Sequence, residues 1–181
     1  MTTLVVVATR AEAAHVPAGL DVVVTRLGKT AAAVATTRAI LERDRKGLVV
    51  VNIGSAGALR EGVEGLHEVG TVLNHDISAE AIRALGYDPQ EELRVGDAEV
   101  VLASGDLFVT DPAVRDELAR RAHLVDMEGY AVAYACRQLD VPVRLVKHVS
   151  DNADESALDW PALVDLSARE LGRWLADHAP G

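Results

Sequence analysis

The stretch Gly47–Leu59, GLVVVNIGSAGAL, decides how the rest of the chain is arranged. Its first part, Leu48–Ile53, is a nearly unbroken run of β-branched residues, which is typical of a strand covered on both faces, as in a parallel sheet. The run leads into Gly54–Gly57, where glycines on both sides of Ser55 predict a sharp turn. Ligand crevices of open α/β sheets lie beyond the carboxyl ends of the strands. This turn is therefore either a purely structural turn or a ligand loop.

Strands and helices are predicted to alternate along the whole chain. Further strands are predicted at Thr3–Ala8, Asp21–Arg26, Val69–His75, Glu99–Ala103, His123–Val125 and Val143–Val149. Helices are predicted from Thr9, at 30–45 with Thr30 as the N-cap, at 78–85, from Asp111-Pro112 with Pro at the first position, at 127–139 and from Asp159 to about Ala179. The segment 86–96 is predicted to be a loop. No linker or repeat interrupts this alternation, so residues 1–181 are predicted to form a single α/β domain.

Composition narrows the class of protein. With 181 residues, of which 49% are hydrophobic, the chain is long enough for one domain with a real core. A net charge of −10 without a Lys/Arg-rich block argues against nucleic-acid binding. No apolar run approaches a membrane span and the start lacks signal-peptide features, so we expect no membrane contact and a cytoplasmic location. The single Cys136 excludes an internal disulfide.

Functional side chains are predicted to gather at one edge of the sheet. Glu12, Ser55, Phe108, Glu128 and Asp151 each follow a predicted strand, and in a mostly parallel sheet these positions converge. Three carboxylates without a cluster of His or Cys ligands favour acid–base or hydrogen-bonding chemistry over metal chemistry, so no metal or cofactor is expected.

Other interpretations of the same residues stay open. Each carboxylate taken alone has an ordinary explanation as a first-turn or loop residue. The pairs His75 with Asp76 and His123 with Asp126 are only weak patterns for a metal site.

Four motifs occur in order: Ile53–Gly57 (IGSAG), Ser104–Val109 (SGDLFV), Val125–Glu128 (VDME) and Val149–Asp154 (VSDNAD). This set resembles the purine nucleoside phosphorylase superfamily, and most of all its hydrolytic branch, the 5′-methylthioadenosine/S-adenosylhomocysteine nucleosidases. The similarity covers nearly the whole chain. It implies a nucleoside phosphorylase-like fold: a three-layer sandwich with a central mixed, mostly parallel sheet.

The resemblance also implies roles for residues around the base and the sugar. Asp151 would bond the purine and protonate N7, Phe108 would stack on the base, and the backbone of Val109 would bond its edge. Burial of Asp151 would raise its pKa and so keep the proton available. Glu128 would bind the ribose 2′- and 3′-hydroxyls, with Met127 against the sugar.

Further roles complete the implied reaction, which is hydrolysis of the N-glycosidic bond. Glu12 would orient and deprotonate the attacking water, the co-substrate. An acid on the leaving-group side and a base on the other side suit an oxocarbenium-like sugar. Four more residues are implied as substrate-binding: Ser55, Lys147, Ser150 and Trp160. The same resemblance implies nucleoside catabolism, methionine salvage and a homodimer.

The chain departs from the family pattern at several places. The segment 16–21 stands where relatives carry an additional pair of strands, and Lys147 stands where they have an arginine, which removes the planar fork. The segment 75–87, which in relatives helps to form the dimer contact and the pocket for the 5′ substituent, matches poorly. Trp160 takes the place of the aromatic residue over the sugar end.

Two alternatives to hydrolysis are left open. A phosphorylase needs paired donors for phosphate, usually including an arginine shortly before the glycine motif, and this chain has Asn52 there. Arg10 is the only basic residue near the first strand's end. Hydrolysis is therefore preferred over phosphorolysis. A shortened member that binds a nucleoside without cleaving it is the second alternative.

Overall fold

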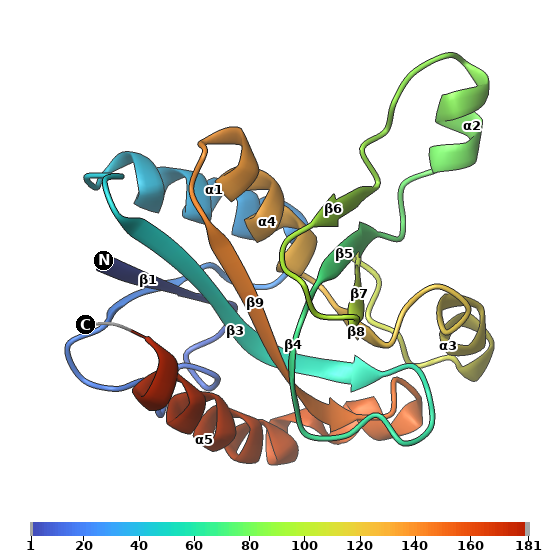
Figure 1. The fold of residues 1–181 in the computed structure, drawn as a ribbon. Helices are drawn as coiled ribbons and strands as arrows, with labels where there is room; N and C mark the ends of the chain where they lie inside the picture. The colour runs from blue at the N-terminus through green and yellow to red at the C-terminus, as the bar shows by residue number, and fades with distance from the viewer. Residues whose placement is uncertain (1, 180–181) are drawn as a thin grey trace.

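The computed structural model describes residues 2–179, and within them one nine-stranded mixed sheet organises the chain (Figure 1). The strand order is β2-β1-β3-β8-β7-β5-β6, and β9 pairs with both β3 and β4. The strands are β1 Thr2–Val7, β2 Asp21–Val24, β3 Leu48–Ala58, β4 Leu66–Glu68, β5 Thr71–Asn74, β6 Glu92–Arg94, β7 Val101–Ser104, β8 Leu124–Asp126 and β9 Val143–Asp151.

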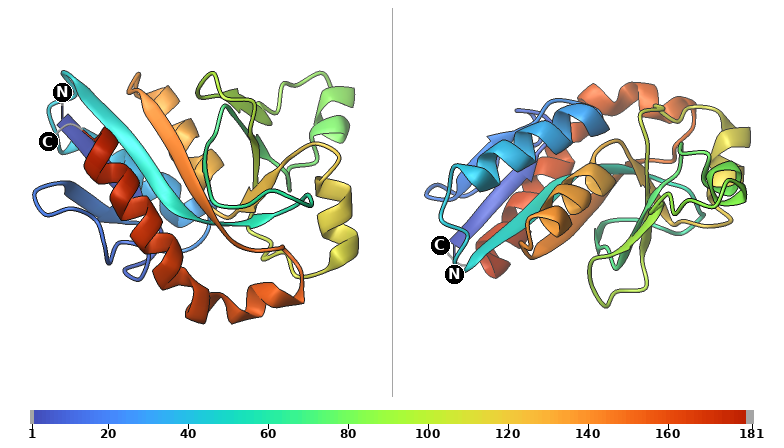
Figure 2. Two further views of the ribbon diagram at one scale, coloured as in Figure 1. Left: turned by 60° about the horizontal axis from the view of Figure 1, so that its bottom comes forward. Right: turned by 90° about the horizontal axis from the view of Figure 1, so that it is seen from above.

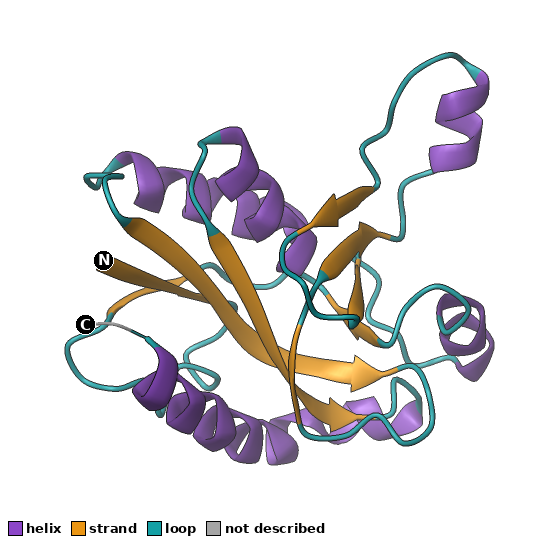
Figure 3. Ribbon diagram, in the orientation of Figure 1, coloured by secondary structure: helices purple, strands orange, loops and turns teal. Residues whose placement is uncertain are grey.

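Helices cover both faces of this sheet and make three layers (Figures 2 and 3). They are α1 Lys29–Leu41, α2 Ala79–Ala84, α3 Pro112–Leu118, α4 Gly129–Gln138, the 3-10 turn η1 Glu155–Asp159, and α5 Trp160–His178. No helix within residues 2–179 is both long and apolar enough to cross a membrane. The α/β fold predicted from the sequence, a sandwich around a mixed, mostly parallel sheet, is confirmed.

The first strand shows why its residues are all apolar. Leu4 and Val6 pack in the core beneath α1 and α4, whereas Val5 and Val7 pack against α5 on the opposite face. Successive side chains of a strand point to opposite faces, so a strand covered on both sides needs an unbroken apolar run. The same reasoning applies to Leu48–Ile53 of β3, whose residues divide between the same two cores.

The neighbours of β3 create the space in which a site can form. On one edge, β1 runs parallel to β3 and pairs with Leu48–Asn52. Further along that edge, β8 runs antiparallel and pairs with Gly57 and Ala58. The carboxyl ends of β1 and β8 therefore point at each other along β3, and the residues 53–56 lie between them. On the other edge, β9 pairs with β3 along most of its length.

The sharp turn predicted at Gly54–Gly57 is wrong, because these residues continue the strand. The glycines serve close packing instead. A methyl group at Gly54 would lie 3.2 Å from Lys147 Nζ and 3.3 Å from Glu12 Oε1. A methyl group at Gly57 would lie 2.9 Å from the Ala153 side chain and 3.0 Å from Asp151 Oδ1. Glycine in a strand often marks such an approach, and the β3–β9 register shifts between Ala56 and Gly57.

Several element boundaries also differ from those predicted. The segment from Thr9 to His15 forms turns rather than a helix, and α1 ends at Leu41, with Gly28 rather than Thr30 at its N-cap. The predicted strand at 69–75 is shorter and corresponds to β5, β4 was not predicted, and the predicted loop at 86–96 contains β6. In contrast, α3 begins with Pro112 at its first position, as predicted, and Asp111 caps it by accepting a hydrogen bond from Ala113 N at 2.8 Å.

Candidate active site

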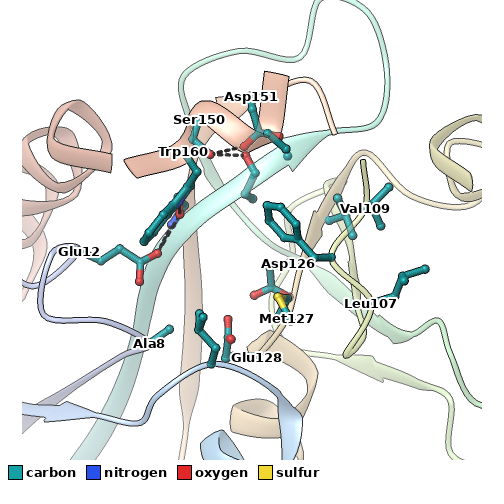
Figure 4. A pocket seen from close by; sticks show the side chains of 17 residues that line it. Ala8, Glu12, Leu107, Val109, Asp126, Met127, Glu128, Ser150, Asp151 and Trp160 are labelled. Atoms are coloured by element: carbon teal, nitrogen blue, oxygen red, sulfur yellow. Dashed lines mark hydrogen bonds between the residues drawn. The ribbon is translucent and has the colours of Figure 1, made fainter. Parts of the chain in front are cut away.

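A cavity of about 320 Å³ opens where β1, β3, β8 and β9 meet (Figure 4). Nine of the ten residues named from the sequence line it: Glu12, Ser55, Phe108, Val109, Met127, Glu128, Ser150, Asp151 and Trp160. The tenth, Lys147, does not line the cavity. The sequence did not identify eight other lining residues: Ala8, Leu27, Ala56, Gly57, Leu107, Val125, Asp126 and Ala157.

Glu12 lies in the loop after β1, and its carboxylate is held on both oxygens. Oε1 accepts hydrogen bonds from Ser55 N at 2.9 Å and Ser55 Oγ at 2.8 Å. Oε2 accepts from Thr9 N at 3.1 Å and from Thr9 Oγ1 at 2.9 Å. The side chain is only 4% exposed. Four donors on a buried carboxylate fix its orientation, which is what a positioned base requires.

Glu128 lies directly after β8, at the lower side of the cavity in Figure 4. Its Oε1 accepts a hydrogen bond from the backbone N–H of Gly28 at 2.8 Å, at the start of α1. Burial, together with the neighbouring negative charge of Asp126, raises the pKa of Glu128 to about 7. The Gly28 N–H and the Lys147 ammonium act in the opposite direction but do not cancel this shift.

A buried polar network that includes Asp126 of the cavity lining joins four strands. Lys147 Nζ of β9 pairs with Asp126 Oδ2 of β8 at 2.8 Å and donates to Asn52 Oδ1 of β3 at 2.9 Å. Asp126 also accepts from Ser104 Oγ and from Gly129 N, which begins α4. Lys147 is 1% exposed, so its charge is neutralised within the protein and is not presented to the cavity.

Asp151 ends β9 on the opposite side of the cavity from Glu128 (Figure 4). Its Oδ2 accepts a hydrogen bond from Ser150 Oγ at 2.6 Å, and its Oδ1 accepts from Ala153 N at 2.9 Å. The side chain is only partly buried. The Asp151 side chain is therefore less buried than the sequence predicted, and only a bound ligand would bury it fully.

The loop after β7, which carries Phe108, is fastened to the start of α1. Asp106 Oδ1 accepts from Lys29 N at 2.7 Å, and Asp106 N donates to Asp76 Oδ2 at 2.8 Å. The Lys29 ammonium closes the ring by pairing with Asp76 Oδ1. Phe108 itself is 49% exposed, so its ring is free to meet a flat ligand group.

Sequence reasoning missed the contribution of α1. Gly28 and Lys29 follow β2 as Glu12 follows β1. Because β1 and β2 are parallel, residues that follow them lie at the same edge of the sheet. Gly28 and Lys29 contribute through backbone N–H groups, which donate to Glu128 and Asp106 and leave no residue-type signal in the sequence. Neither weak metal pair is free to act as one, because His123 Nδ1 accepts from Val101 N and Asp76 pairs with Lys29.

Comparisons with known proteins agree with this arrangement. Residues 73–173 match the family described as the phosphorylase superfamily. The chain is 30% identical over 180 residues to a 5′-methylthioadenosine/S-adenosylhomocysteine nucleosidase of Shewanella frigidimarina, covering 81% of this chain and 76% of that protein. It is 34% identical over 101 residues to an aminodeoxyfutalosine nucleosidase of Helicobacter pylori, covering 54% of this chain and 44% of that relative.

Solved structures show the same fold. The chain aligns with a 5′-methylthioadenosine/S-adenosylhomocysteine nucleosidase from Helicobacter pylori with a TM-score of 0.83 at 23% identity, over 98% of this chain and 97% of that one. An enzyme of the same name from Neisseria meningitidis gives a TM-score of 0.82 at 23% identity, over 97% of each chain. The chain therefore belongs to the phosphorylase superfamily, and within it to the nucleosidases, enzymes that hydrolyse the N-glycosidic bond of nucleosides. The resemblance inferred from the four motifs is confirmed.

Proposed function

We propose that the protein hydrolyses the N-glycosidic bond of a purine nucleoside that resembles 5′-methylthioadenosine or S-adenosylhomocysteine, with Asp151 as the acid and Glu12 as the base. The observation that carries this proposal is the separation of Asp151 and Glu12 to different sides of one cavity, with Glu128 between β8 and α1. Cleavage of a glycosidic bond needs an acid on the leaving group and a base for water on the other side of the sugar.

In this proposal, the base and the sugar each have their own contacts. Phe108 stacks on the purine, the backbone of Val109 bonds its edge, and Asp151 delivers a proton to N7. Glu128 accepts hydrogen bonds from the 2′- and 3′-hydroxyls, with Met127 against the sugar.

The bond changes balance without a cofactor. Water loses a proton to Glu12 while its oxygen forms a bond to C1′. The electron pair of the breaking C1′–N9 bond goes to the purine, which receives the proton of Asp151. Ser150 supports this step by holding Asp151 Oδ2.

Charge favours hydrolysis over phosphorolysis. None of the seventeen described residues that line the cavity is Lys or Arg, and four of them are carboxylates: Glu12, Asp126, Glu128 and Asp151. Lys147 is engaged by Asp126 and Asn52, and Lys29 by Asp76. Placing a phosphate dianion in this negatively charged cavity, which offers no paired donors, would cost electrostatic free energy. A neutral water molecule has no such cost.

Product analysis tests the proposal directly. We expect the protein to release free purine and free ribose, or free 5′-substituted ribose, at the same rate with and without phosphate. The assay is chromatography of a purine nucleoside panel that includes 5′-methylthioadenosine. A sugar 1-phosphate as the main product would instead assign the chain to phosphorolysis, and failure to cleave any nucleoside while binding one would favour a non-catalytic member.

The pH dependence of ribonucleoside binding follows from Glu128. Its pKa, about 7 in the unliganded protein, lies above the ordinary 4.5, so the carboxylate that accepts from ribose hydroxyls forms only as pH rises through 7. We expect affinity for a non-hydrolysable ribonucleoside analogue to be roughly tenfold lower at pH 6 than above pH 8, measured by calorimetry. The same shift means that Glu128 stabilises the fold most below pH 4.5 and that this contribution is lost as pH rises through about 7.

Two controls isolate this effect. Glu128→Gln should bind more weakly at high pH and show a nearly flat profile. A 2′-deoxy analogue, which lacks one hydroxyl, should show a smaller pH dependence than the ribonucleoside. A profile unchanged by Glu128→Gln would mean that another group controls binding.

The wider setting remains a prediction from family resemblance: a homodimer, a cytoplasmic location, and a part in nucleoside catabolism and methionine salvage. One feature supports a second copy as partner. The arm that carries α2 projects from the sheet (Figure 1) and exposes Leu85 and Tyr87 at 74% and 71%. Sedimentation of the protein and of a variant with both residues changed to Ser measures whether this arm contributes to a dimer.

A further inference from the structure

Trp160 is joined to Glu12 through one serine hydroxyl. Trp160 is the first residue of α5, and its indole Nε1–H donates to Ser55 Oγ at 2.7 Å. The same hydroxyl donates to Glu12 Oε1 at 2.8 Å. Figure 4 shows the Trp160 ring beside the Glu12 carboxylate, on one side of the cavity. A residue far along the chain therefore contacts the hydroxyl that holds the carboxylate after β1.

The direction of these two bonds is set by chemistry. An indole N–H can only donate, and an ionised carboxylate can only accept. The Ser55 hydroxyl has one hydrogen and two lone pairs, so it accepts from Trp160 and donates to Glu12. Both ends of the bridge thus impose the same orientation on a group that otherwise rotates freely.

Trp160 matters because Glu12 has no idle lone pair. Its four acceptor positions are filled by the two N–H groups and two hydroxyls of Thr9 and Ser55. To take a proton from water, Glu12 must release one donor, and only a hydroxyl can turn away without moving the backbone. Thr9 Oγ1 is already an acceptor for Glu12 N at 3.2 Å. Ser55 Oγ, anchored by Trp160, can turn its hydrogen while its oxygen stays in place.

We propose that Trp160 is a positioning residue for hydrolysis: its indole N–H anchors Ser55 Oγ so that this hydroxyl serves Glu12 as donor before proton transfer and as acceptor after it. In that step, one proton passes from water to Glu12 Oε1, and the Ser55 hydrogen rotates away without leaving its oxygen. The inference rests on the proposed function and adds a residue that acts through Ser55 rather than on substrate.

The test is a double-mutant cycle of Trp160→Phe and Ser55→Ala, read as kcat and KM on the best nucleoside substrate. Phenylalanine keeps an aromatic wall and removes the N–H. We expect Trp160→Phe to lower kcat about 3- to 10-fold, the size of one neutral hydrogen bond, with KM within about twofold. In the Ser55→Ala background the same change should have almost no effect on kcat. Thermal melts of all four proteins verify that each is folded.

Other outcomes separate the explanations. An equal loss of kcat in both backgrounds would overturn the inference and make Trp160 a structural residue. A rise in KM with kcat unchanged, or no change in either, would overturn it as well and leave Trp160 as cavity wall only. Absence of turnover by the unmodified protein would overturn the proposed function and the inference together, so the two failures are distinguishable.

Discussion

Asp151→Asn is expected to lower the rate of nucleoside cleavage by roughly 100-fold or more while leaving the protein folded. An amide cannot deliver a proton to the leaving base, and general acid catalysis contributes about 10² to 10⁴ in rate. The fold should tolerate the change because Asp151 is only partly buried and the amide oxygen can still accept from Ala153 N. Steady-state turnover of the best purine nucleoside, together with a thermal melt, measures both statements.

Two controls make this result specific. Glu155→Gln makes the same carboxylate-to-amide change at an exposed residue of η1, outside the cavity, and should retain normal turnover. A riboside with an activated leaving group, such as nitrophenol, needs no acid and should be cleaved by Asp151→Asn far better than a purine nucleoside. Near-native cleavage of purine nucleosides by Asp151→Asn would show that the acid is elsewhere.

The second large effect is expected for Glu12→Gln, which should lower kcat by about 100-fold or more with little change in ground-state binding. Glu12 acts only when water attacks, so its loss removes transition-state stabilisation. Its amide group would also face a donor, either Thr9 N or Ser55 N, and leave it unpaired. That costs about 1–3 kcal/mol of stability. Stopped-time product assays, calorimetry with a non-hydrolysable analogue and a thermal melt measure the three quantities.

Glu128→Gln supplies the contrast. A charged acceptor bond to the ribose hydroxyls contributes about 1.5–3 kcal/mol, so this variant should weaken binding as well as rate. It should lose little further on a 2′-deoxy substrate. If Glu12→Gln abolished binding while Glu128→Gln left it unchanged, the two roles would have to be exchanged. If neither variant affected binding or rate, the protein would have the fold of the family without using these residues for catalysis.

The sequence predicted the sheet well where burial dictates residue type. Strands β1, β3 and β9 are covered on both faces, so their apolar runs leave little choice of structure. The motif at Gly54–Gly57 was misjudged because glycine permits both a turn and a close approach. The close approach is identified only by the side chains that pack against these glycines, Glu12, Lys147 and Asp151. These residues come from distant parts of the chain, so a local pattern could not show it.

Most of the residues proposed for the candidate site from the sequence do line the cavity. They follow strands whose ends meet there, so the sheet itself places them. Lys147 was the exception, since its place depends on Asp126 and Asn52, two buried partners that no local pattern connects. The Trp160–Ser55 bond is equally non-local, because donor and acceptor are 105 positions apart in the sequence.

The meeting of β1 and β8 along β3 has a consequence for folding. The cavity needs β1 and β3 from the first third of the chain, β8 from the second half, and β9 with Trp160 still later. A chain emerging from the ribosome therefore carries β3 with one edge unpaired until β9 has been made, and such an edge favours association with other chains. Pairing of β9 with β3 is also slow, because it joins segments that are far apart in the sequence. In refolding, nucleosidase activity should accordingly return no earlier than the pairing of β9 with β3, because residues of both strands line the cavity.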